Sequence, residues 1–428
     1  MKSLHALIDC NSFFVSCEKL FRPDLADKPV VVLSNNDGVV VSRSQQAKQL
    51  GIAMGEPYFK IKRMVEHAGL VVFSSNFRLY GDMSNRVMQT LLRWTPHVEV
   101  YSIDEAFLDF SDLGLSEAAV EPLLTEIVAT VKKWTGIPIS IGLGPTKTLA
   151  KVANDIAKKS GGACNLLHRE QRSAALARLP IGDVWGVGRR LAPKMAKLGI
   201  RTAADLAAID PIWMRRHFSV IQEKLVRELQ GESCLDVEET PQAKKSIQVS
   251  RSFRDATDHF DTLAEAVATF AAKACEKARQ QCSVATGVYV HMNTSRFNGS
   301  YISDGIAEGF DRPTGHSPEV IRTAVNLLRR IYRPGPQYKK ATVILLELRD
   351  AAAERSQGLL FPIDDKMPEQ RAKEERLMAS LDAINRRVGR GTVFFGAEGT
   401  ETSWKAASDH ASPGYTTRWS DLPVAHAR

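Results

Sequence analysis

Residues 101–108 read YSIDEAFL and residues 4–9 read LHALID, so acidic side chains interrupt or end apolar runs at two places in the chain. Leu4 to Asp9 has the pattern of a short buried strand that ends at a carboxylate. Asp104 and Glu105 lie between two further strand candidates. Acidic residues in apolar surroundings are costly to bury unless they are paired or bind a metal. We therefore expect all three carboxylates to lie at the ends of adjacent strands. The two further strand candidates are Val98 to Ile103 and Ala106 to Phe110.

Such a carboxylate platform suits phosphoryl transfer from a nucleoside triphosphate. That reaction needs two divalent cations, about 4 Å apart, to hold the attacking and leaving oxygens. Magnesium prefers carboxylate, carbonyl and water oxygens. The other interpretation is ordinary turn chemistry, since Asp and Glu are common between strands. The three residues alone leave both interpretations open.

The first 170 residues alternate between strand and helix patterns, which favours an α+β catalytic domain. Asn35-Asn36-Asp37-Gly38 joins two β-branched runs and predicts a hairpin. A helix from Ser44 should stop at Gly51. The runs of the hairpin are Pro29 to Leu33 and Val39 to Ser42, and the later elements are helices over Glu117 to Trp134 and Thr146 to Lys159 with a strand over Ile137 to Leu143.

Beyond residue 170 the sequence divides into four segments. Residues 170–235 read as short helices, and Glu238 to Lys245 reads as a linker. Residues 246–348 then read strand, helix, strand, strand, helix, strand, which is the order of a ferredoxin-like split βαβ unit. Asp350 to Lys373 is charged and broken by proline, so we expect a flexible connector there.

Composition sets wide bounds on the function. The 428 residues are 44% hydrophobic and 25% charged, which is ordinary for globular proteins, and the length suggests about three domains. Lys and Arg number 57 against 49 Asp and Glu, and this excess permits a polyanionic partner. The six cysteines form no Cys-x-x-Cys pair, which argues against a zinc site or a disulfide framework. The start has no signal-peptide pattern, so we expect a cytoplasmic protein.

The acidic segments also carry a resemblance to a known family. Asp9 to Glu18 (DCNSFFVSCE) and Ser102 to Phe107 (SIDEAF) resemble the two acidic motifs of Y-family DNA polymerases, and Asn76 to Ser84 resembles a third segment of that family. The resemblance covers essentially the whole chain. It implies that Asp9, Asp104 and Glu105 are catalytic and bind two Mg²⁺ ions, with the main-chain carbonyl of Cys10 as a further ligand.

The resemblance implies a fold as well. We expect an α+β multidomain protein with the right-hand architecture of Y-family polymerases: a palm, small fingers, a helical thumb with a helix-hairpin-helix, a ferredoxin-like little finger and a C-terminal tail. The expected boundaries are 1–18 and 76–170 for the palm, 19–75 for the fingers, 171–237 for the thumb, 238–349 for the little finger, and 350–428 for the connector and a partner-binding tail.

Several nucleotide contacts follow from the same resemblance. Phe14 falls at the steric gate that would clash with a ribose 2′-oxygen, and Phe13 lies beside it; without the motif, Phe14 would read as a core residue. Lys158 and Lys48 fall where the family contacts the incoming triphosphate. Most of the family has Tyr and Arg at the positions of Gln45 and Lys48, so the detailed contacts differ here. Lys147, Lys151 and Lys158 share one helical face, for which a solvated surface is the alternative.

Two segments are expected to bind DNA. Gly186-Val187-Gly188 precedes a basic helix and is similar to a helix-hairpin-helix, although a glycine-rich helix connector is the alternative. Lys244, Lys245 and Arg251 lie on basic, partly strand-like sequence that would contact the DNA backbone without reading its sequence.

The C-terminal sequence narrows the resemblance. Gln357, Leu360 and Phe361 lie in a segment, QGLLF, that resembles the peptide with which bacterial polymerases dock on the sliding clamp. Residues 390–396 and 412–419 resemble the UmuC-type catalytic subunits of bacterial DNA polymerase V. That resemblance implies a processed UmuD-type dimer and the RecA filament as partners.

The expected activity is therefore that of an error-prone translesion DNA polymerase in SOS repair and mutagenesis, which transfers a nucleotide from a dNTP to a primer 3′-hydroxyl. One alternative is a non-catalytic DNA-binding scaffold that docks on the clamp, which would not need the carboxylates. A metal-dependent nuclease is another, and it would not need a sugar gate or triphosphate lysines.

Overall fold

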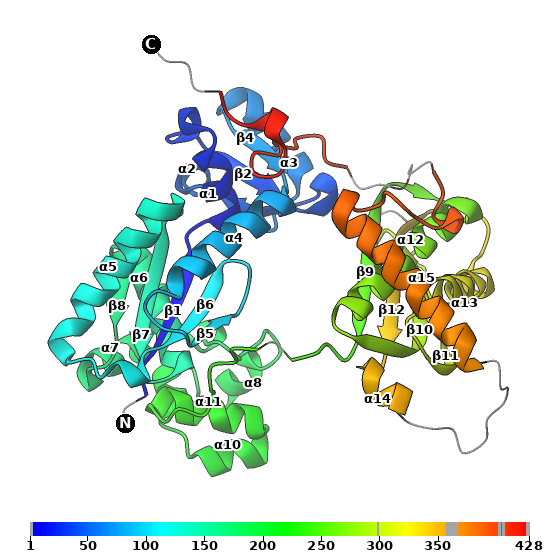
Figure 1. Cartoon of the computed structure of the whole chain (residues 1–428). Helices are drawn as coiled ribbons and strands as arrows, with labels where there is room; N and C mark the ends of the chain where they lie inside the picture. Colours follow the sequence, from blue (N-terminus) through cyan, green and yellow to red (C-terminus); the bar gives the residue numbers. More distant parts are fainter. Residues whose placement is uncertain are drawn as a thin grey trace. The chain divides into compact units, whose positions relative to one another are not determined.

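The computed structural model describes residues 3–240, 242–297, 299–356, 367–400, 404 and 407–424 (Figure 1). The chain forms two compact units. The first comprises residues 1–34, 38–241 and 409–428, and the second comprises residues 35–37 and 242–408. The predicted clamp-binding residues Gln357, Leu360 and Phe361 lie outside the described residues.

A five-stranded sheet forms the centre of the first unit, in the order β5-β6-β1-β7-β8. Strand β1 pairs antiparallel with both β6 and β7, and β8 runs parallel to β7. Glu105 is the first residue of β6, whereas we expected it between strands, and Asp104 lies in the turn before it. The strands are β1 (His5–Cys10), β5 (Val98–Val100), β6 (Glu105–Asp109), β7 (Ile139–Gly144) and β8 (Ala163–Asn165).

Helices cover both faces of this sheet because successive side chains of β1 point to opposite sides. Ala6, Ile8 and Cys10 share a core with residues of α4 (Phe77–Leu91) and α5 (Glu117–Thr135). On the other face, Leu7 and Phe107 pack on Ala150 of α6 (Lys147–Ser160). Asp9 and Glu105 lie on the face of α6.

Helix α6 is fixed closely to the sheet. The Thr146 hydroxyl accepts a hydrogen bond from the amide of Leu149 and caps the helix start. The side-chain amide of Asn154 donates to the carbonyls of Leu7 and Ser140, at 2.9 and 3.0 Å. Gly142 of β7 allows α6 to lie this close to the sheet. A Cβ at this position would lie 2.0 Å from the backbone nitrogen of Asn154 and would clash with it.

A small three-stranded sheet, in the order β3-β2-β4, has its own core in the predicted fingers. The predicted hairpin is confirmed, because β2 and β3 pair antiparallel. Its turn contains Asn36 and Asp37 at positive φ, 66° and 46°, which these residues tolerate better than most. The elements are α1 (Phe13–Leu20), η1 (Pro23–Leu25), β2 (Val30–Leu33), η2 (Asn35–Asp37), β3 (Val40–Arg43), α2 (Gln45–Gln49), α3 (Tyr58–His67), β4 (Val71–Ser74) and, in the palm, η3 (Ser111–Leu113).

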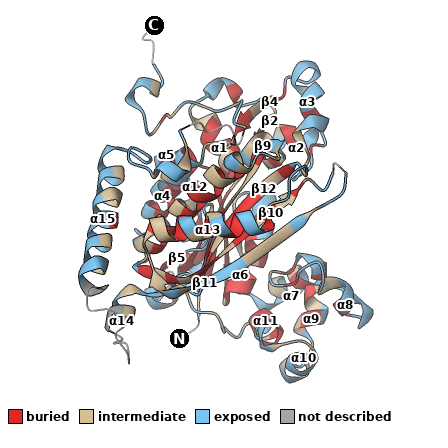
Figure 2. Cartoon of the chain, turned by 90° about the vertical axis from the view of Figure 1, so that its right-hand side faces the viewer, coloured by how far each residue is buried: buried red, intermediate tan, exposed pale blue. Residues whose placement is uncertain are grey.

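The predicted thumb consists of short helices around an apolar core that includes Val184, Met195 and Leu206. Figure 2 shows buried residues on the inner sides of these helices and exposed residues outside. The helices are α7 (Arg169–Arg178), η4 (Ile181–Asp183), α8 (Ala192–Lys197), α9 (Ala203–Ala207), α10 (Pro211–His217) and α11 (Val220–Gln230).

The second unit has the predicted order of strands and helices. Its sheet runs β11-β10-β12-β9, with all neighbours antiparallel, and α12 and α13 pack on each other and on the sheet. The elements are β9 (Ile247–Thr257), α12 (Phe260–Gln280), β10 (Ser283–Thr294), β11 (Ser303–Thr314), α13 (Ser317–Ile331), β12 (Tyr338–Leu346) and a short β13 (Arg349–Asp350) on β10.

The C-terminal region differs from our expectation of a flexible connector over residues 350–373, because both of its described ends are helical. The Asp350 carboxylate accepts hydrogen bonds from Ala352 and Ala353 and so caps α14 (Ala351–Ser356). Helix α15 (Met367–Val388) is largely exposed (Figure 2), but Asp382 makes a bidentate ion pair with Arg279 of α12 at 2.7 and 2.8 Å. Further 3-10 turns are η5 (Gly396–Glu398) and η6 (Trp419–Asp421). No helix among the described residues is long and apolar enough to span a membrane.

Candidate active site

The predicted catalytic carboxylates come together at one end of β1. Asp9 is the register partner of Glu105 in the antiparallel pair β1·β6. The amide of Cys10 donates to the carbonyl of Asp104 at 2.8 Å, which holds the turn against the end of β1. Because directly opposed residues share a face of the sheet, the side chains of Asp9 and Glu105 both face α6.

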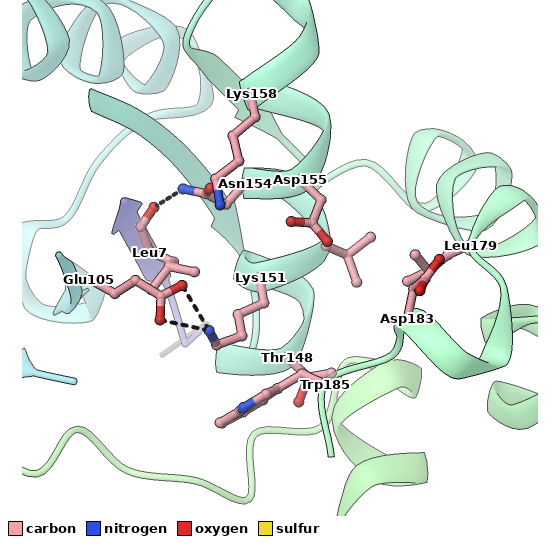
Figure 3. Close-up of a pocket in the computed structure, with 11 residues that line it drawn as sticks. Leu7, Glu105, Thr148, Lys151, Asn154, Asp155, Lys158, Leu179, Asp183 and Trp185 are labelled. Atoms are coloured by element: carbon pink, nitrogen blue, oxygen red, sulfur yellow. Dashed lines mark hydrogen bonds and ion pairs between the residues drawn. The ribbon is translucent and has the colours of Figure 1, made fainter. Parts of the chain in front are cut away.

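Lysines of α6 pair with these carboxylates. Lys158 Nζ lies 2.8 Å from Asp9 Oδ2. Lys151 Nζ lies 3.1 and 3.3 Å from the two Glu105 oxygens (Figure 3). The Ser102 hydroxyl donates to Asp104 Oδ1 at 2.6 Å. Each of the three carboxylates therefore has a donor from the chain itself.

The lysine face of α6 is solvated only in part, because Lys158 is exposed whereas Lys151 is half-buried. Lys147 is buried, and its Nζ lies 2.6 Å from Glu99 Oε2. Together with Lys151 and Lys158 it forms a row in which every lysine pairs with a carboxylate of the palm sheet or its turns. The helical spacing that places these lysines on one face thus directs them toward the candidate site.

Burial and neighbouring charges shift the pKa values of Asp9 and Lys158. Burial raises the pKa of the Asp9 carboxyl to about 6; the Lys158 ammonium lowers it, and the Glu105 and Asp104 carboxylates raise it further. Burial acts to lower the pKa of Lys158, but the Asp9, Asp155 and Glu105 carboxylates together raise it by more, so the net shift is upward. Both members of this pair are therefore charged near neutral pH.

The donor chemistry fits a hard divalent cation, although the side chains of Asp9 and Glu105 point toward lysines and that of Asp104 toward Ser102. Among the described residues, no three or more His, Cys, Asp or Glu side chains are grouped as a metal site. The backbone register nevertheless keeps Asp9, Asp104 and Glu105 adjacent, and their carboxylate oxygens are the donors that Mg²⁺ prefers. Cys10 could contribute only its carbonyl, because burial raises the pKa of its thiol far above the usual range.

The two predicted nucleotide-contacting phenylalanines differ in their surroundings. Phe13 is buried in the main core, so its side chain has a structural role there. Phe14 is half-buried, and its ring stacks on Tyr80 with centroids 4.4 Å apart and planes 11° apart. Lys48 is exposed on α2.

The predicted DNA-binding residues lie in both units. Gly186 has a φ of 89°, a conformation that favours glycine, and Val187 is buried in the thumb core. The hairpin can therefore offer a partner its main chain but not the Val187 side chain. In the second unit Lys244 and Lys245 are exposed, and Arg251 is half-buried on β9.

Sequence reasoning gave no role to several residues at the site. Lys151 contacts Glu105, and its ammonium also lies over the ring of Tyr101 at 4.6 Å. The Trp185 indole donates to the Tyr101 hydroxyl at 3.2 Å. Glu105, Lys151, Lys158 and Trp185 are among the residues that line a cavity of about 200 Å³. Figure 3 shows how these side chains lie around it. The seven-residue step from Lys151 to Lys158 was the available signal.

Family comparisons match most of the chain. The impB/mucB/samB family matches residues 8–155, that family's C-terminal domain matches residues 244–359, and the IMS family HHH motif matches residues 172–200. A domain of unknown function matches residues 375–425.

Individual proteins are similar over nearly the full length. Protein UmuC of Salmonella typhimurium is 44% identical over 427 residues, which cover 98% of this chain and 99% of the relative. DNA polymerase IV 1 of Bacillus subtilis is 28% identical, with coverage of 91% and 92%. A solved Y-family DNA polymerase chimera superposes with a TM-score of 0.66 at 22% identity, over 81% of this chain and 99% of that chain, and it shows the shared fold.

Proposed function

Since the chain belongs to the impB/mucB/samB family and is an error-prone translesion DNA polymerase, we propose that Asp9, Asp104 and Glu105 hold two Mg²⁺ ions in its nucleotidyl transfer. Y-family polymerases are in general metal-dependent, and the residue assignment goes beyond that statement. The observation that carries it is the pairing of Asp9 with Glu105 beside the Asp104 turn.

In this proposal the primer 3′-hydroxyl attacks the α-phosphate of the dNTP and pyrophosphate leaves. When bound, the two ions supply charge neutralisation at the attacking and leaving oxygens. Lys158 and Lys151 are the internal counter-charges of Asp9 and Glu105 before substrate binds. Lys158 then turns from Asp9 to the triphosphate, while Lys48 gives a second phosphate contact from α2.

Selection of the sugar is assigned to Phe14. A half-buried ring stacked on Tyr80 cannot recede easily, so a ribose 2′-oxygen above it would clash. The Phe13 side chain supports α1 from within the core, and a nucleotide contact of Phe13 stays a prediction.

Further partners are proposed from the similarity to UmuC-type proteins and from exposed basic side chains and main-chain amides. The 186–188 hairpin would bind the DNA backbone through main-chain amides, and Lys244, Lys245 and Arg251 would add charge. Gln357, Leu360 and Phe361 would dock on the sliding clamp. A processed UmuD-type dimer and the RecA filament are the proposed activating partners, and the cytoplasm stays the predicted location.

A non-catalytic scaffold is not favoured, because homologues are named as DNA polymerases and the chain keeps all three carboxylates together where β1 ends and β6 begins. The nuclease alternative leaves the stacked Phe14 and the Lys158 pair without a role.

Counting bound Mn²⁺, a stand-in for Mg²⁺, by paramagnetic resonance tests the metal assignment. The full chain would be mixed with a primer-template whose primer lacks a 3′-hydroxyl, and with the matching dNTP. We expect two ions per chain beyond those held by the DNA and nucleotide alone, and fewer in Glu105→Ala. The exposed carboxylate of Asp112 is the matched control, so Asp112→Ala should keep both ions. Equal counts in the wild type and Glu105→Ala would refute the assignment.

A further inference from the structure

The C-terminal residues 409–424, here called the C-terminal strap, belong to the first unit and contact the end of β4 in its small sheet. The amide of Ser74, at the end of β4, donates to the carbonyl of His410 at 2.9 Å, and the His410 amide donates to the Ser74 hydroxyl at 3.0 Å. The His410 ring also lies 3.1 Å from the Tyr58 hydroxyl. The strap is thus fixed to the fingers on one side of Ser412.

On the other side of Ser412 the strap is fixed by an aromatic stack. Tyr415 is buried in the main core, and its ring stacks on Phe21 at 4.7 Å with planes 6° apart. The side-chain amide of Asn76 donates to Ser412 Oγ at 2.9 Å and to the Pro413 carbonyl at 3.2 Å. Ser412 is therefore held in place from both directions.

Ser412 contacts a buried acid in the core of the catalytic unit. Its hydroxyl donates to Glu18 Oε1 at 3.1 Å, and the Tyr80 hydroxyl donates to the same oxygen at 2.7 Å. Glu18 is wholly buried, and its other oxygen, Oε2, has no hydrogen-bond partner among the described residues. A buried carboxylate is costly, so an apolar residue would serve packing alone better.

This contact chain ends at the sugar gate. Tyr80 is itself wholly buried, and its ring is the surface on which Phe14 stacks. Packing against a flat ring face leaves a ring free to slide in its own plane. The hydrogen bond from the Tyr80 hydroxyl prevents the Tyr80 ring from sliding along the axis through that hydroxyl. Ser412, Glu18, Tyr80 and Phe14 therefore form one continuous series of contacts.

We propose that the C-terminal strap positions the sugar gate, with Ser412 acting through Glu18 and Tyr80 to hold Phe14 where it excludes a 2′-oxygen. This inference rests on the proposed role of Phe14. Ser412 and Glu18 are positioning residues, since neither touches the nucleotide. It also assigns a function to part of the matched domain of unknown function, residues 375–425.

The test compares single-nucleotide insertion of dCTP and CTP opposite a template guanine by the full chain. Ser412→Ala and Tyr80→Phe each remove one hydroxyl of the contact series. Each should lower the ratio of kcat/KM for dCTP to that for CTP by about 2- to 10-fold, the effect of losing one hydrogen bond. The double variant should lose little more than either single variant, because both interrupt the same series.

Controls separate positioning from a general loss of structure. Ser412→Thr keeps the hydroxyl and should restore the ratio. Ser420→Ala removes an exposed hydroxyl of the same strap, which contacts Asp421, and should leave the ratio unchanged. Thermal unfolding of each variant checks that it is folded.

The Phe14→Ala variant distinguishes a failure of this inference from a failure of the proposal that Phe14 is the sugar gate. If Phe14→Ala lowers the ratio while Ser412→Ala and Tyr80→Phe keep it, the strap has no positioning role and the inference is wrong. If Phe14→Ala itself leaves the ratio unchanged, the gate assignment fails and the inference fails with it. Lower ratios in all three variants, with the Ser420→Ala control intact, support the inference.

Discussion

Asp9 and Glu18 are both buried carboxylates, but their partners differ. Asp9 has the Lys158 ammonium at 2.8 Å, whereas Glu18 has two hydroxyl donors and, among the described residues, no cation within ion-pair distance. In an ion pair such as Asp9–Lys158, the carboxylate can exchange its partner for a metal ion and the ammonium for a phosphate. The two hydroxyl hydrogen bonds to Glu18 instead hold their side chains in fixed positions. The first arrangement suits a reaction site, and the second suits a support for it.

The Glu18 environment predicts a pH-dependent stability. Burial raises the pKa of Glu18 from 4.5 to about 7, against the opposing effect of the Tyr80 and Ser412 hydrogen bonds. The folded state therefore holds this proton more tightly than the unfolded state, and its free energy of unfolding falls as pH rises from about 4.5 to 7. The fall should reach about 3 kcal/mol.

Urea unfolding of wild type and Glu18→Gln at pH 5, 6, 7 and 8 checks this expectation. Gln keeps an acceptor for Tyr80 and Ser412 but cannot ionise. Stability of the wild type relative to Glu18→Gln should decrease across this range. A difference that stays constant with pH would show that Glu18 does not titrate there.

For individual residues, the sequence suggested a role for some and not for others. Asp9, Asp104 and Glu105 were singled out because carboxylates in apolar strands are unusual and because a family motif surrounds them, and Phe14 only because of that motif. Glu18 was not found, since its partners lie 62 and 394 residues away along the chain. No local pattern records such contacts.

Among the elements, helix α6 determines how the site is built, because its lysines reach Asp9 and Glu105 only if it lies close to the sheet. Gly142 permits that distance. In Gly142→Ala the new Cβ would lie 2.0 Å from the Asn154 nitrogen and 2.5 Å from the Ala150 carbonyl, both of them backbone atoms. We expect a loss of at least about 3 kcal/mol in the free energy of unfolding, as in severe overpacking.

Gly81→Ala is the matched control in helix α4. Gly81 is exposed, and a Cβ there would meet nothing within 4 Å. Alanine should stabilise this helix by about 0.5–1 kcal/mol, so the two substitutions are expected to have opposite signs in chemical unfolding. A Gly142→Ala variant as stable as the wild type would show that α6 can move away from the sheet.

Element predictions succeeded where residue periodicity was strong. The order of strands and helices in the second unit was predicted from alternation and helical spacing, whereas β4 and β8 of the first unit were not predicted. Helix α15 was missed because its sequence is highly charged, and its docking depends on the long-range pair of Asp382 with Arg279. Such a helix resembles a connector when only local composition is considered.

For the whole molecule, the C-terminal region contributes to both units. Residues up to 408 belong to the second unit, and residues 409–428 belong to the first. Trp404 is buried and packs edge-to-face on Phe270 of α12, with ring centroids 5.4 Å apart. The region is therefore an integral part of each unit's packing, which the sequence alone did not indicate.

Trp404→Ala should lower the stability of the second unit. Loss of a buried aromatic side chain costs about 3–5 kcal/mol, and we expect the lower end because the indole Nε1 has no hydrogen-bond partner among the described residues. Trp419 is 91% exposed, so Trp419→Ala should change stability by less than about 0.5 kcal/mol. Guanidinium unfolding compares the two, and equal small effects would mean that Trp404 is not part of the core.

The most direct test of the central claim is primer extension across an abasic site by the full chain. The reaction would contain magnesium, four deoxynucleotides, the sliding clamp, a processed UmuD-type partner and activated RecA. We expect extension by the wild type and a loss of about 1,000-fold or more in a variant carrying Asp104→Ala and Glu105→Ala. Undiminished extension by that variant, folded and bound to primer-template, would contradict the assignment of these carboxylates to the reaction.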